Sequence, residues 1–145
     1  TGATGRTIAE HLLQRGHEVS YFHGEGTQTP PAHERLTLHP YISARDLEHS
    51  LLTHLRTHKI DVVIHSAAVS DYTLSTRFAT KLDSGRPLRL DLVPAPKIVQ
   101  QIRKASQNPN TRLIAFKLTH ETPREDRLTR ARALIDQSGA DLVVA

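Results

Sequence analysis

The segment formed by residues 61–72, DVVIHSAAVSDY, combines side chains that could hold a ligand. Its branched apolar residues are typical of a buried strand. Small side chains follow, those of Ser66, Ala67 and Ala68, and the carboxylate of Asp71 comes shortly after them. A loop that only turns the chain more often carries Gly, Pro or Asn. The pattern therefore indicates a surface on which a ligand could lie flat, with a carboxylate beside it.

A glycine-rich turn opens the chain. In TGATGRTIAEHLLQRG, Gly2 and Gly5 precede apolar residues with the spacing of a helix, which Gly16 ends. Backbone N–H groups at the start of a helix can bind phosphate. Such a turn normally follows a strand, so we expect at least one N-terminal strand to be missing from the sequence. The final strand DLVVA is followed by no loop, and we expect a missing segment there too.

Alternating strands and helices must position these residues. One helix is predicted to start at Ser43, which forms a capping-box pattern with Asp46. A second is predicted to start at the prolines of PAPKIVQQIRK, with Ile98 and Ile102 facing inward. A third is predicted to run from an N-cap at Thr122 to Gly139. Strands are predicted at residues 17–22, 35–39, 60–65, 88–92, 112–116 and 141–145.

The strands predict the fold class. In residues 88–92 leucine alternates with charge, as in a half-buried strand, whereas the main strands are apolar on both faces. We therefore expect one α/β domain over residues 1–145, a Rossmann-like, doubly wound and mostly parallel sheet between two helical layers. Sheets of this type bind ligands at the carboxyl ends of their strands. HSAAVSDY and KLTHET both lie at such ends.

The composition bounds the function. The chain has 145 residues, no Cys, three Phe, three Tyr and a formal net charge of +4. The lack of Cys removes disulfides, thiolate metal sites and a cysteine nucleophile, and suits the reducing cytoplasm. The few aromatic rings and the lack of a dense basic run argue against nucleic-acid binding. No apolar stretch approaches the roughly 20 residues of a membrane helix. The modest basic excess fits phosphorylated small molecules or simply a solvated surface.

The TGATG turn alone also suggests a nicotinamide-dependent short-chain reductase or epimerase. In the dinucleotide fingerprint three glycines lie three residues apart, but the third place here is Ile8. None of the three tyrosines has a lysine four residues further on. This reading stays open as an alternative.

Four segments, in this order and spacing, resemble phosphopantothenate–cysteine ligase, also called phosphopantothenoylcysteine synthetase, of coenzyme A biosynthesis. They are SAAVSDY, KLDSGRPLRLDLVPAPKI, LIAFKL and ADLVVA. The resemblance covers nearly the whole chain. It is most specific in the AAVSDY loop and in the run from a lysine through Ser-Gly and an alternating strand to Pro-Lys-Ile. The family's Asn-His-Ser-Ser/Thr-Gly-x-x-Gly turn is matched at its end by Thr1, Gly2 and Gly5.

The resemblance implies a ligase that activates the carboxylate of 4′-phosphopantothenate with a nucleoside triphosphate. An acyl-nucleotide and pyrophosphate form, and the amine of cysteine then displaces the nucleotide. Bacterial members mostly use CTP, but FKL also occurs in the kind that uses ATP, so the nucleotide stays open. The reaction needs donors around phosphates and reactants held in line, but no covalent nucleophile. Family members are dimers, so a cytoplasmic homodimer is the expectation.

The resemblance also implies roles for single residues. In the family the Ala-Ala-Val-x-Asp-Tyr loop lies against the nucleotide, which would explain the small side chains of Ser66, Ala67 and Ala68. It assigns Asp71 to the nucleotide and its metal ion. Lys81 falls where the family carries the lysine that stabilises negative charge during activation, and it is the one predicted catalytic residue.

Further nucleotide-binding residues follow from the same resemblance. Phe116 matches a phenylalanine at a strand end that contacts the base. Lys117 occurs at this place in part of the family and could reach a phosphate. Gly2 and Gly5 would leave room for phosphate at the start of the helix.

Some positions depart from the family's pattern. Leu82 and Asp83 stand where Ile and Ser are usual, and Asp83 adds a negative charge near Lys81. Ala115 stands where Gly or Ser is more usual, so the backbone would approach the nucleotide less closely. The asparagine that contacts the acyl-nucleotide would precede the first residue, and a flap between Tyr72 and Lys81 is often longer. A non-catalytic nucleotide-binding homologue is therefore a second alternative.

Ten histidines raise the question of a metal site. His54 and His58 are spaced i, i+4, but no Glu lies between them and no third ligand is placed. We therefore predict no metal site made of grouped protein ligands and expect Mg²⁺ to be held mainly by the triphosphate.

Overall fold

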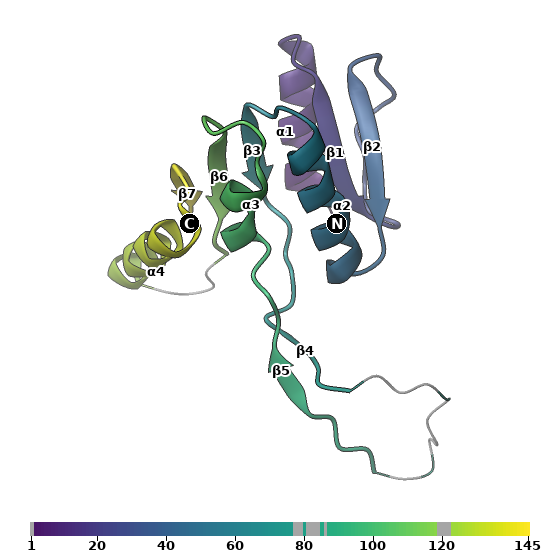
Figure 1. Ribbon diagram of the computed structural model, residues 1–145, viewed down its shortest axis with the longest axis vertical. Helices are drawn as coiled ribbons and strands as arrows, with labels where there is room; N and C mark the ends of the chain where they lie inside the picture. The colour runs from purple at the N-terminus through teal and green to yellow at the C-terminus, as the bar shows by residue number, and fades with distance from the viewer. Residues whose placement is uncertain (1, 77–79, 81–84, 86, 119–122) are drawn as a thin grey trace. The chain divides into compact units, whose positions relative to one another are not determined.

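The computed structural model describes residues 2–76, 80, 85, 87–118 and 123–145. Its elements are α1 (Ala3–Gln14), β1 (Val19–Gly24), β2 (Leu36–Tyr41), α2 (Ala44–Thr57), β3 (Val62–His65), β4 (Tyr72–Leu74), β5 (Leu92–Pro94), α3 (Val99–Ala105), β6 (Arg112–Phe116), α4 (Arg124–Ser138) and β7 (Leu142–Val144), drawn in Figure 1. They form two compact units. The larger unit comprises residues up to 67 and from 98 onward, and the smaller unit comprises residues 68–97.

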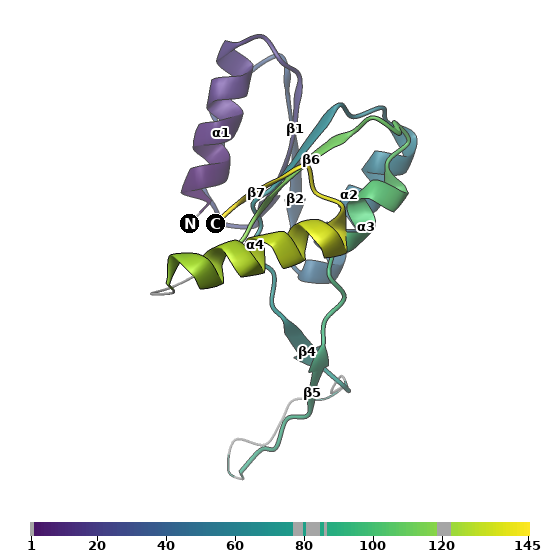
Figure 2. The ribbon, with the colours of Figure 1, turned by 90° about the vertical axis from the view of Figure 1, so that its left-hand side faces the viewer.

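The larger unit is built on parallel strands. β1 pairs with β2, and β3, β6 and β7 form a second sheet in that order. Helix α1 lies on one side of these strands, and α2 and α3 lie together on the other (Figure 2). Helix α4 packs on α3 and β7. The predicted α/β class with a mostly parallel, Rossmann-like sheet is thereby confirmed.

The core lies where α2 and α3 meet the strands. Leu55, Ile102 and Leu113 are at most 1% exposed, and Ile98 is 4% exposed. Burial of such a side chain stabilises the fold by about 1.5–3 kcal/mol. The inward direction predicted for Ile98 and Ile102 is confirmed. The apolar face of α2 is formed by its buried leucines Leu47, Leu51, Leu52 and Leu55.

The capping box predicted at the start of α2 is present. The Ser43 hydroxyl oxygen accepts from the Asp46 backbone N–H at 3.2 Å, and the Asp46 carboxylate accepts from the Ser43 N–H at 2.9 Å. Two backbone donors that the helix itself leaves unpaired are satisfied in this way. The Ser43 hydroxyl also donates to the Asp46 carboxylate at 2.8 Å, and this hydrogen bond, followed by that from the Ser43 N–H, lowers the pKa of Asp46.

The strand predicted at residues 88–92 is wrong in its bounds. Only Leu92–Pro94 form a strand, β5, which pairs antiparallel with β4 in the smaller unit. Leu88, Leu90 and Leu92 are 53%, 47% and 57% exposed, so the predicted half-burial is wrong. A hairpin of two strands has no second layer of its own against which it could bury an apolar face.

Two predicted helix starts are also wrong. α3 begins at Val99, not at the prolines before it, because Pro94 belongs to β5 and faces Tyr72 in the antiparallel ladder. A residue that precedes proline is held away from helical conformation, which keeps the chain extended as far as Pro96.

α4 begins at Arg124 with Pro123 at the N-cap position, one residue later than predicted. Thr122, the predicted cap, lies outside the described residues. The predicted end is confirmed, since Gly139 adopts a left-handed conformation with φ of 67° after the last turn. In the part of the chain described here, no helix is both long and apolar enough to cross a bilayer.

Candidate functional site

Two of the predicted segments reach the same edge of the β3–β6–β7 sheet. His65, the last residue of β3, is in register with Ala115 of β6. Because the strands are parallel, Ser66 and Ala67 leave β3 at the level where β6 ends with Phe116. Lys117 follows directly, and its backbone N–H donates to the Val144 carbonyl at 2.8 Å. This edge is the carboxyl end, where open parallel sheets bind their ligands.

Gly5 brings the start of α1 to the same loop. A Cβ atom on Gly5 would lie 3.1 Å from the Tyr21 hydroxyl oxygen and 3.5 Å from Ser66 Oγ. Three elements therefore meet here: the first turn of α1, strand β1 and the loop after β3. The close approach of Tyr21 is by itself a physical reason for glycine at this position, besides any room that it leaves for phosphate.

Gly2 shapes the turn before α1. Its φ of 72° is left-handed, and a Cβ there would lie 3.1 Å from Thr27 Cβ and 3.2 Å from the Gln28 carbonyl oxygen. Gly2 is the N-cap residue of α1, which has no side-chain cap and no acidic residue in its first turn. The first N–H groups of a helix lack intrahelical partners, so this end of the 12-residue helix can receive an anion.

Tyr21 is a residue of this region that the sequence did not single out. Its hydroxyl donates toward the carbonyl oxygens of Gly2 and Gln28, each at 3.5 Å. Burial raises the pKa of Tyr21, so the hydroxyl stays protonated and remains a donor. This contact depends on how β1 packs against the glycine turn at the start of α1. No local pattern in HEVSYF signals it.

The end of β6 offers an aromatic ring and a cation. Phe116 and Lys117 are both partly exposed, whereas Ala115, just before them, is 1% exposed. On the neighbouring strand, burial lowers the pKa of the His65 imidazole, which favours its neutral form. The edge therefore combines the neutral His65 imidazole, the partly exposed Phe116 and Lys117, and the start of α1.

The remaining predicted residues belong to the smaller unit. Ala68 and Asp71 are exposed, and the carboxylate of Asp71 forms an ion pair with the ammonium group of Lys97. The backbone carbonyl of Asp71 accepts from the Ala95 N–H at 2.9 Å. Lys97 is a second residue that sequence reasoning missed, although it lies in the Pro-Lys-Ile run. Lys81, the predicted catalytic lysine, lies outside the described residues.

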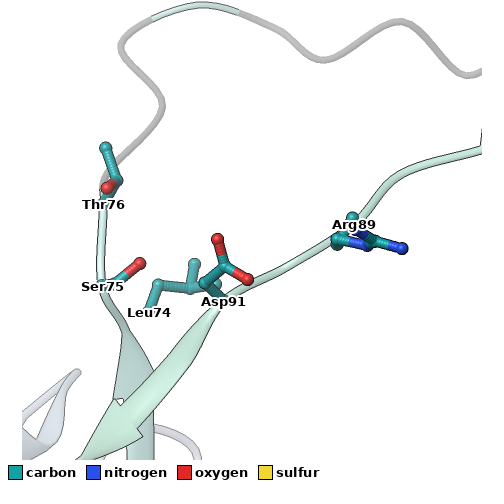
Figure 3. Close-up of a pocket in the computed structure, with 5 residues that line it drawn as sticks. All are labelled: Leu74, Ser75, Thr76, Arg89 and Asp91. Atoms are coloured by element: carbon teal, nitrogen blue, oxygen red, sulfur yellow. The ribbon is translucent and has the colours of Figure 1, made fainter.

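The smaller unit also contains a hollow of about 330 Å³, drawn in Figure 3. It is lined by Leu74, Ser75, Thr76, Arg89 and Asp91. The Ser75 N–H donates to the Asp91 carbonyl at 2.9 Å, so the backbone here holds the hairpin together. None of the predicted site residues that the structure describes is among those that line this hollow.

Within residues 2–76, 87–118 and 123–145, together with 80 and 85, no three His, Cys, Asp or Glu side chains are grouped so that they could hold a metal ion. A metal ion bound by this part of the chain would therefore need most of its ligands from a bound substrate or from water.

Comparison with known proteins places this arrangement in a family. A model of the DNA/pantothenate metabolism flavoprotein C-terminal domain matches residues 1–145. A coenzyme A biosynthesis bifunctional protein from Thermococcus kodakarensis is 30% identical over 145 residues, which is 100% of this chain and 35% of that protein. Its counterpart from Methanocaldococcus jannaschii is 24% identical over the same length and 34% of that protein.

Solved structures agree in fold. The crystal structure of the DNA/pantothenate metabolism flavoprotein from Streptococcus pneumoniae has a TM-score of 0.86 and 27% identity, and the match covers 100% of this chain and 71% of that one. The C-terminal domain of a coenzyme A biosynthesis bifunctional protein has a TM-score of 0.75 at 24% identity, covering 100% and 64%.

The chain spans about a third of the length of the curated relatives that it matches. The family match, by contrast, extends over every residue, including the glycine turn, the small-residue loop and the end of β6. The resemblance to phosphopantothenoylcysteine synthetase is thereby confirmed at the level of the family, and the chain belongs to the DNA/pantothenate metabolism flavoprotein C-terminal domain family.

Proposed function

We propose that the protein is a phosphopantothenate–cysteine ligase that uses CTP, with ATP as the alternative nucleotide. The observation that carries the proposal is the meeting of Gly5, Ser66 and the end of β6 at one carboxyl edge, in a chain of this family. The bifunctional relatives are named for coenzyme A biosynthesis. We also propose a cytoplasmic location, which suits a biosynthetic enzyme without cysteine.

The residues of the larger unit would hold the nucleotide. The N–H groups of the first turn of α1, which have no partner within the helix, lie next to Gly2 and Gly5 and are suited to phosphate oxygens. The small side chains of Ser66 and Ala67 would let the nucleotide lie against the loop. The partly exposed ring of Phe116 offers a flat apolar surface for a base.

The cations would act on the charge that develops. In the first step a carboxylate oxygen of 4′-phosphopantothenate attacks the α-phosphorus, and pyrophosphate leaves. In the second step the cysteine amine attacks the acyl carbon, loses a proton, and the nucleoside monophosphate leaves. We assign Lys81 to the negative charge of the first step and Lys117 to a phosphate. Preorganised cations of this kind lower the barrier most when water is excluded.

Asp71, with the small Ala68 in the same loop, would contribute to the nucleotide and to Mg²⁺. Magnesium is commonly bound by one or two carboxylates together with substrate phosphates and water. The exposed carboxylate of Asp71 fits such a role, because the ion would need only one ligand from it. Bound Mg²⁺ would neutralise part of the triphosphate charge.

We further propose a homodimer in which the smaller unit takes part. Tyr72, Leu88, Leu90, Leu92 and Val93 are between 41% and 58% exposed. An isolated pair of strands is at best marginally stable in water. A second copy of the chain would cover this apolar surface, and the mass measured by light scattering tests this directly. A monomer at micromolar concentration would contradict it.

The ligase function is tested by pyrophosphate release. We expect release only when 4′-phosphopantothenate is supplied with CTP or ATP, and formation of the cysteine amide only when cysteine is added. Parallel assays with each nucleotide decide between CTP and ATP. Tight binding of NADPH without any release of pyrophosphate would instead favour the reductase alternative. Nucleotide binding without turnover would favour a non-catalytic homologue.

A further inference from the structure

The ion pair between Asp71 and Lys97 joins two motifs. Asp71 is the aspartate of the AAVSDY motif, and Lys97 lies in the Pro-Lys-Ile run, 26 residues further along the chain. These are the two segments that carried the resemblance most specifically. The sequence alone assigns no role to Lys97, because it does not show that these two segments contact each other.

The backbone of the smaller unit fixes this pair. β4 and β5 are antiparallel, with Tyr72 opposite Pro94. The hydrogen bond from the Ala95 N–H to the Asp71 carbonyl continues the same register by one residue, so Asp71 lies opposite Ala95. Lys97 is two residues beyond Ala95 and therefore lies diagonally across from Asp71 on the same face. Diagonal neighbours of this kind are within reach of a long side chain.

Stability alone does not explain the pair. The side chains of Lys97 and Asp71 are 45% and 67% exposed. Exposed pairs of this type contribute little to stability, because water and salt screen them. The main physical effects of Lys97 are local: it restricts the rotation of the carboxylate and offsets its negative charge.

We propose that Lys97 is a positioning residue that holds the carboxylate of Asp71 for the nucleotide. This inference rests on the proposed role of Asp71 in binding the triphosphate and Mg²⁺. Without Lys97, the carboxylate would lose this ion pair, so its orientation would be less restricted and less of its negative charge toward an anionic ligand would be offset. The effect falls mainly on nucleotide binding, because Lys97 itself needs no contact with the reacting atoms.

A double-mutant cycle tests the proposal. In the ligase assay, Lys97→Met should raise KM for the nucleotide about tenfold, which corresponds to 1.4 kcal/mol, while kcat changes less. Lys97→Arg should restore most of the affinity, and Lys104→Met, at an exposed lysine on α3, should match the wild type. Circular dichroism and the melting temperature should be unchanged in Lys97→Met.

The background of Asp71→Asn separates the two ways in which Lys97 could act. If Lys97 acts through Asp71, Lys97→Met adds nothing further to the loss caused by Asp71→Asn. Additive losses would show that Lys97 acts on the nucleotide directly and would overturn the proposal, as would a wild-type KM in Lys97→Met. If the wild type releases no pyrophosphate, the proposed function itself has failed. The same cycle measured on the Kd of Mg·CTP by calorimetry still decides the role of Lys97.

Discussion

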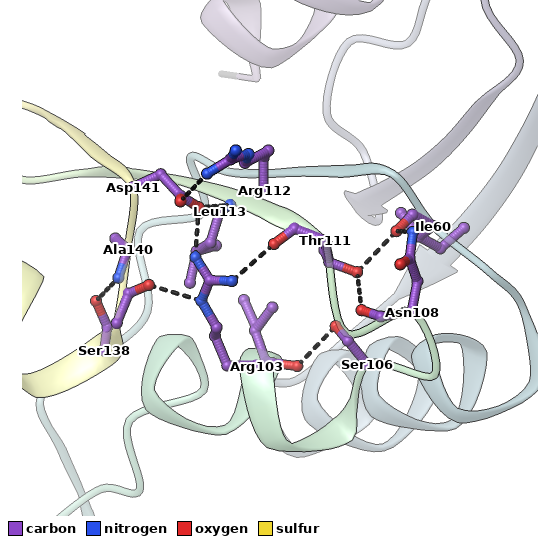
Figure 4. A network of polar contacts seen from close by, with 12 residues as sticks. Ile60, Arg103, Ser106, Asn108, Thr111, Arg112, Leu113, Ser138, Ala140 and Asp141 are labelled. Atoms are coloured by element: carbon purple, nitrogen blue, oxygen red, sulfur yellow. Dashed lines mark hydrogen bonds and ion pairs between the residues drawn. The ribbon is translucent and has the colours of Figure 1, made fainter.

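The two ends of the β3–β6–β7 sheet use polar groups in opposite ways. At the end where β6 and β7 begin, Arg103 of α3 donates to the carbonyl oxygens of Gly139 at 2.7 Å and Thr111 at 2.8 Å (Figure 4). Asp141 accepts from the Leu113 N–H at 2.7 Å and also pairs with Arg103. The polar groups of this network therefore form hydrogen bonds or ion pairs with other parts of the chain.

The carboxyl end of the same sheet is built differently. It presents the small side chains of Ser66 and Ala67, the partly exposed ring of Phe116 and the ammonium group of Lys117. A network such as that around Asp141 fixes helices to strands, whereas partly exposed groups of mixed type leave room for a ligand. The comparison predicts that substitutions at the first end act on stability and substitutions at functional positions act on turnover.

The largest effect on turnover is expected from Lys81→Gln. Loss of a cation that stabilises transition-state charge should lower kcat about 10²- to 10³-fold. Glutamine keeps much of the length and polarity of the side chain, so the melting temperature should not change. Steady-state pyrophosphate release measures the effect, with Lys104→Gln as the control. Turnover near that of the wild type would remove Lys81 from its proposed role.

Leu113→Ala should lower stability and leave turnover unchanged, the reverse of Lys81→Gln. Leu113 is 0% exposed, and removing a fully buried leucine side chain typically lowers the free energy of unfolding by about 2–5 kcal/mol. Urea unfolding measures this loss, while kcat per folded molecule should stay near the wild-type value.

Phe116→Leu is the matched control on the same strand. It should leave the free energy of unfolding nearly unchanged, because Phe116 is only partly buried, and should raise KM for the nucleotide. If both variants lost stability alike and neither changed KM, the division of β6 into a structural and a functional end would be wrong.

Asp141→Asn should have a smaller effect on stability than Leu113→Ala. The hydrogen bond from the Leu113 N–H and then that from Arg112 lower the pKa of Asp141. Because the folded pKa lies below the unfolded one, this carboxylate stabilises the fold above its ordinary pKa. That contribution is lost as pH falls through the lowered value. The difference in melting temperature between wild type and Asp141→Asn should therefore be present at pH 7 and shrink below about pH 4. A constant difference would contradict the role of the charge.

Much of the fold could be predicted because its signals are local. The capping box at Ser43, the inward Ile102 and the helix end at Gly139 each depend on a few neighbouring residues. The alternating leucines of residues 88–92 predicted a half-buried strand with one apolar face, which is wrong, because they are exposed and only Leu92 lies in β5. Whether another layer covers that face depends on the rest of the assembly, and the sequence pattern carries no signal for it.

The site was predictable in part for the same reason. Family motifs identified the loop at Ser66 and the end of β6 at Phe116, and the strand register shows that both reach one edge. The contacts of Tyr21 and Lys97 depend on which strands pair and in which register. Such long-range pairing leaves no mark in the local sequence, so these two residues emerged only from the structure.

A cluster of rings between β1, β2 and α2 predicts a final, smaller effect. His39 stacks on Phe22 with ring centroids 4.4 Å apart and lies 5.1 Å from His54, which stacks on His58 at 4.1 Å. The Nε2 atoms of His39 and His54 are buried, and neither has a hydrogen-bond partner among the described residues. Burial first, and then the positive charge of neighbouring histidines, lowers the pKa of both rings.

The sign of the pH dependence follows from these shifts. The unfolded chain takes up protons at its ordinary histidine pKa of about 6.5, whereas folded His39 and His54 resist protonation. Stability should therefore be constant at neutral pH and decline as pH falls below about 6.5. His39→Phe removes one partly buried imidazole and should flatten the melting-temperature profile between about pH 6.5 and 5. The surface variant His11→Gln should keep the wild-type slope. A decline as steep in His39→Phe as in the wild type would show that protonation of His39 does not limit stability in acid.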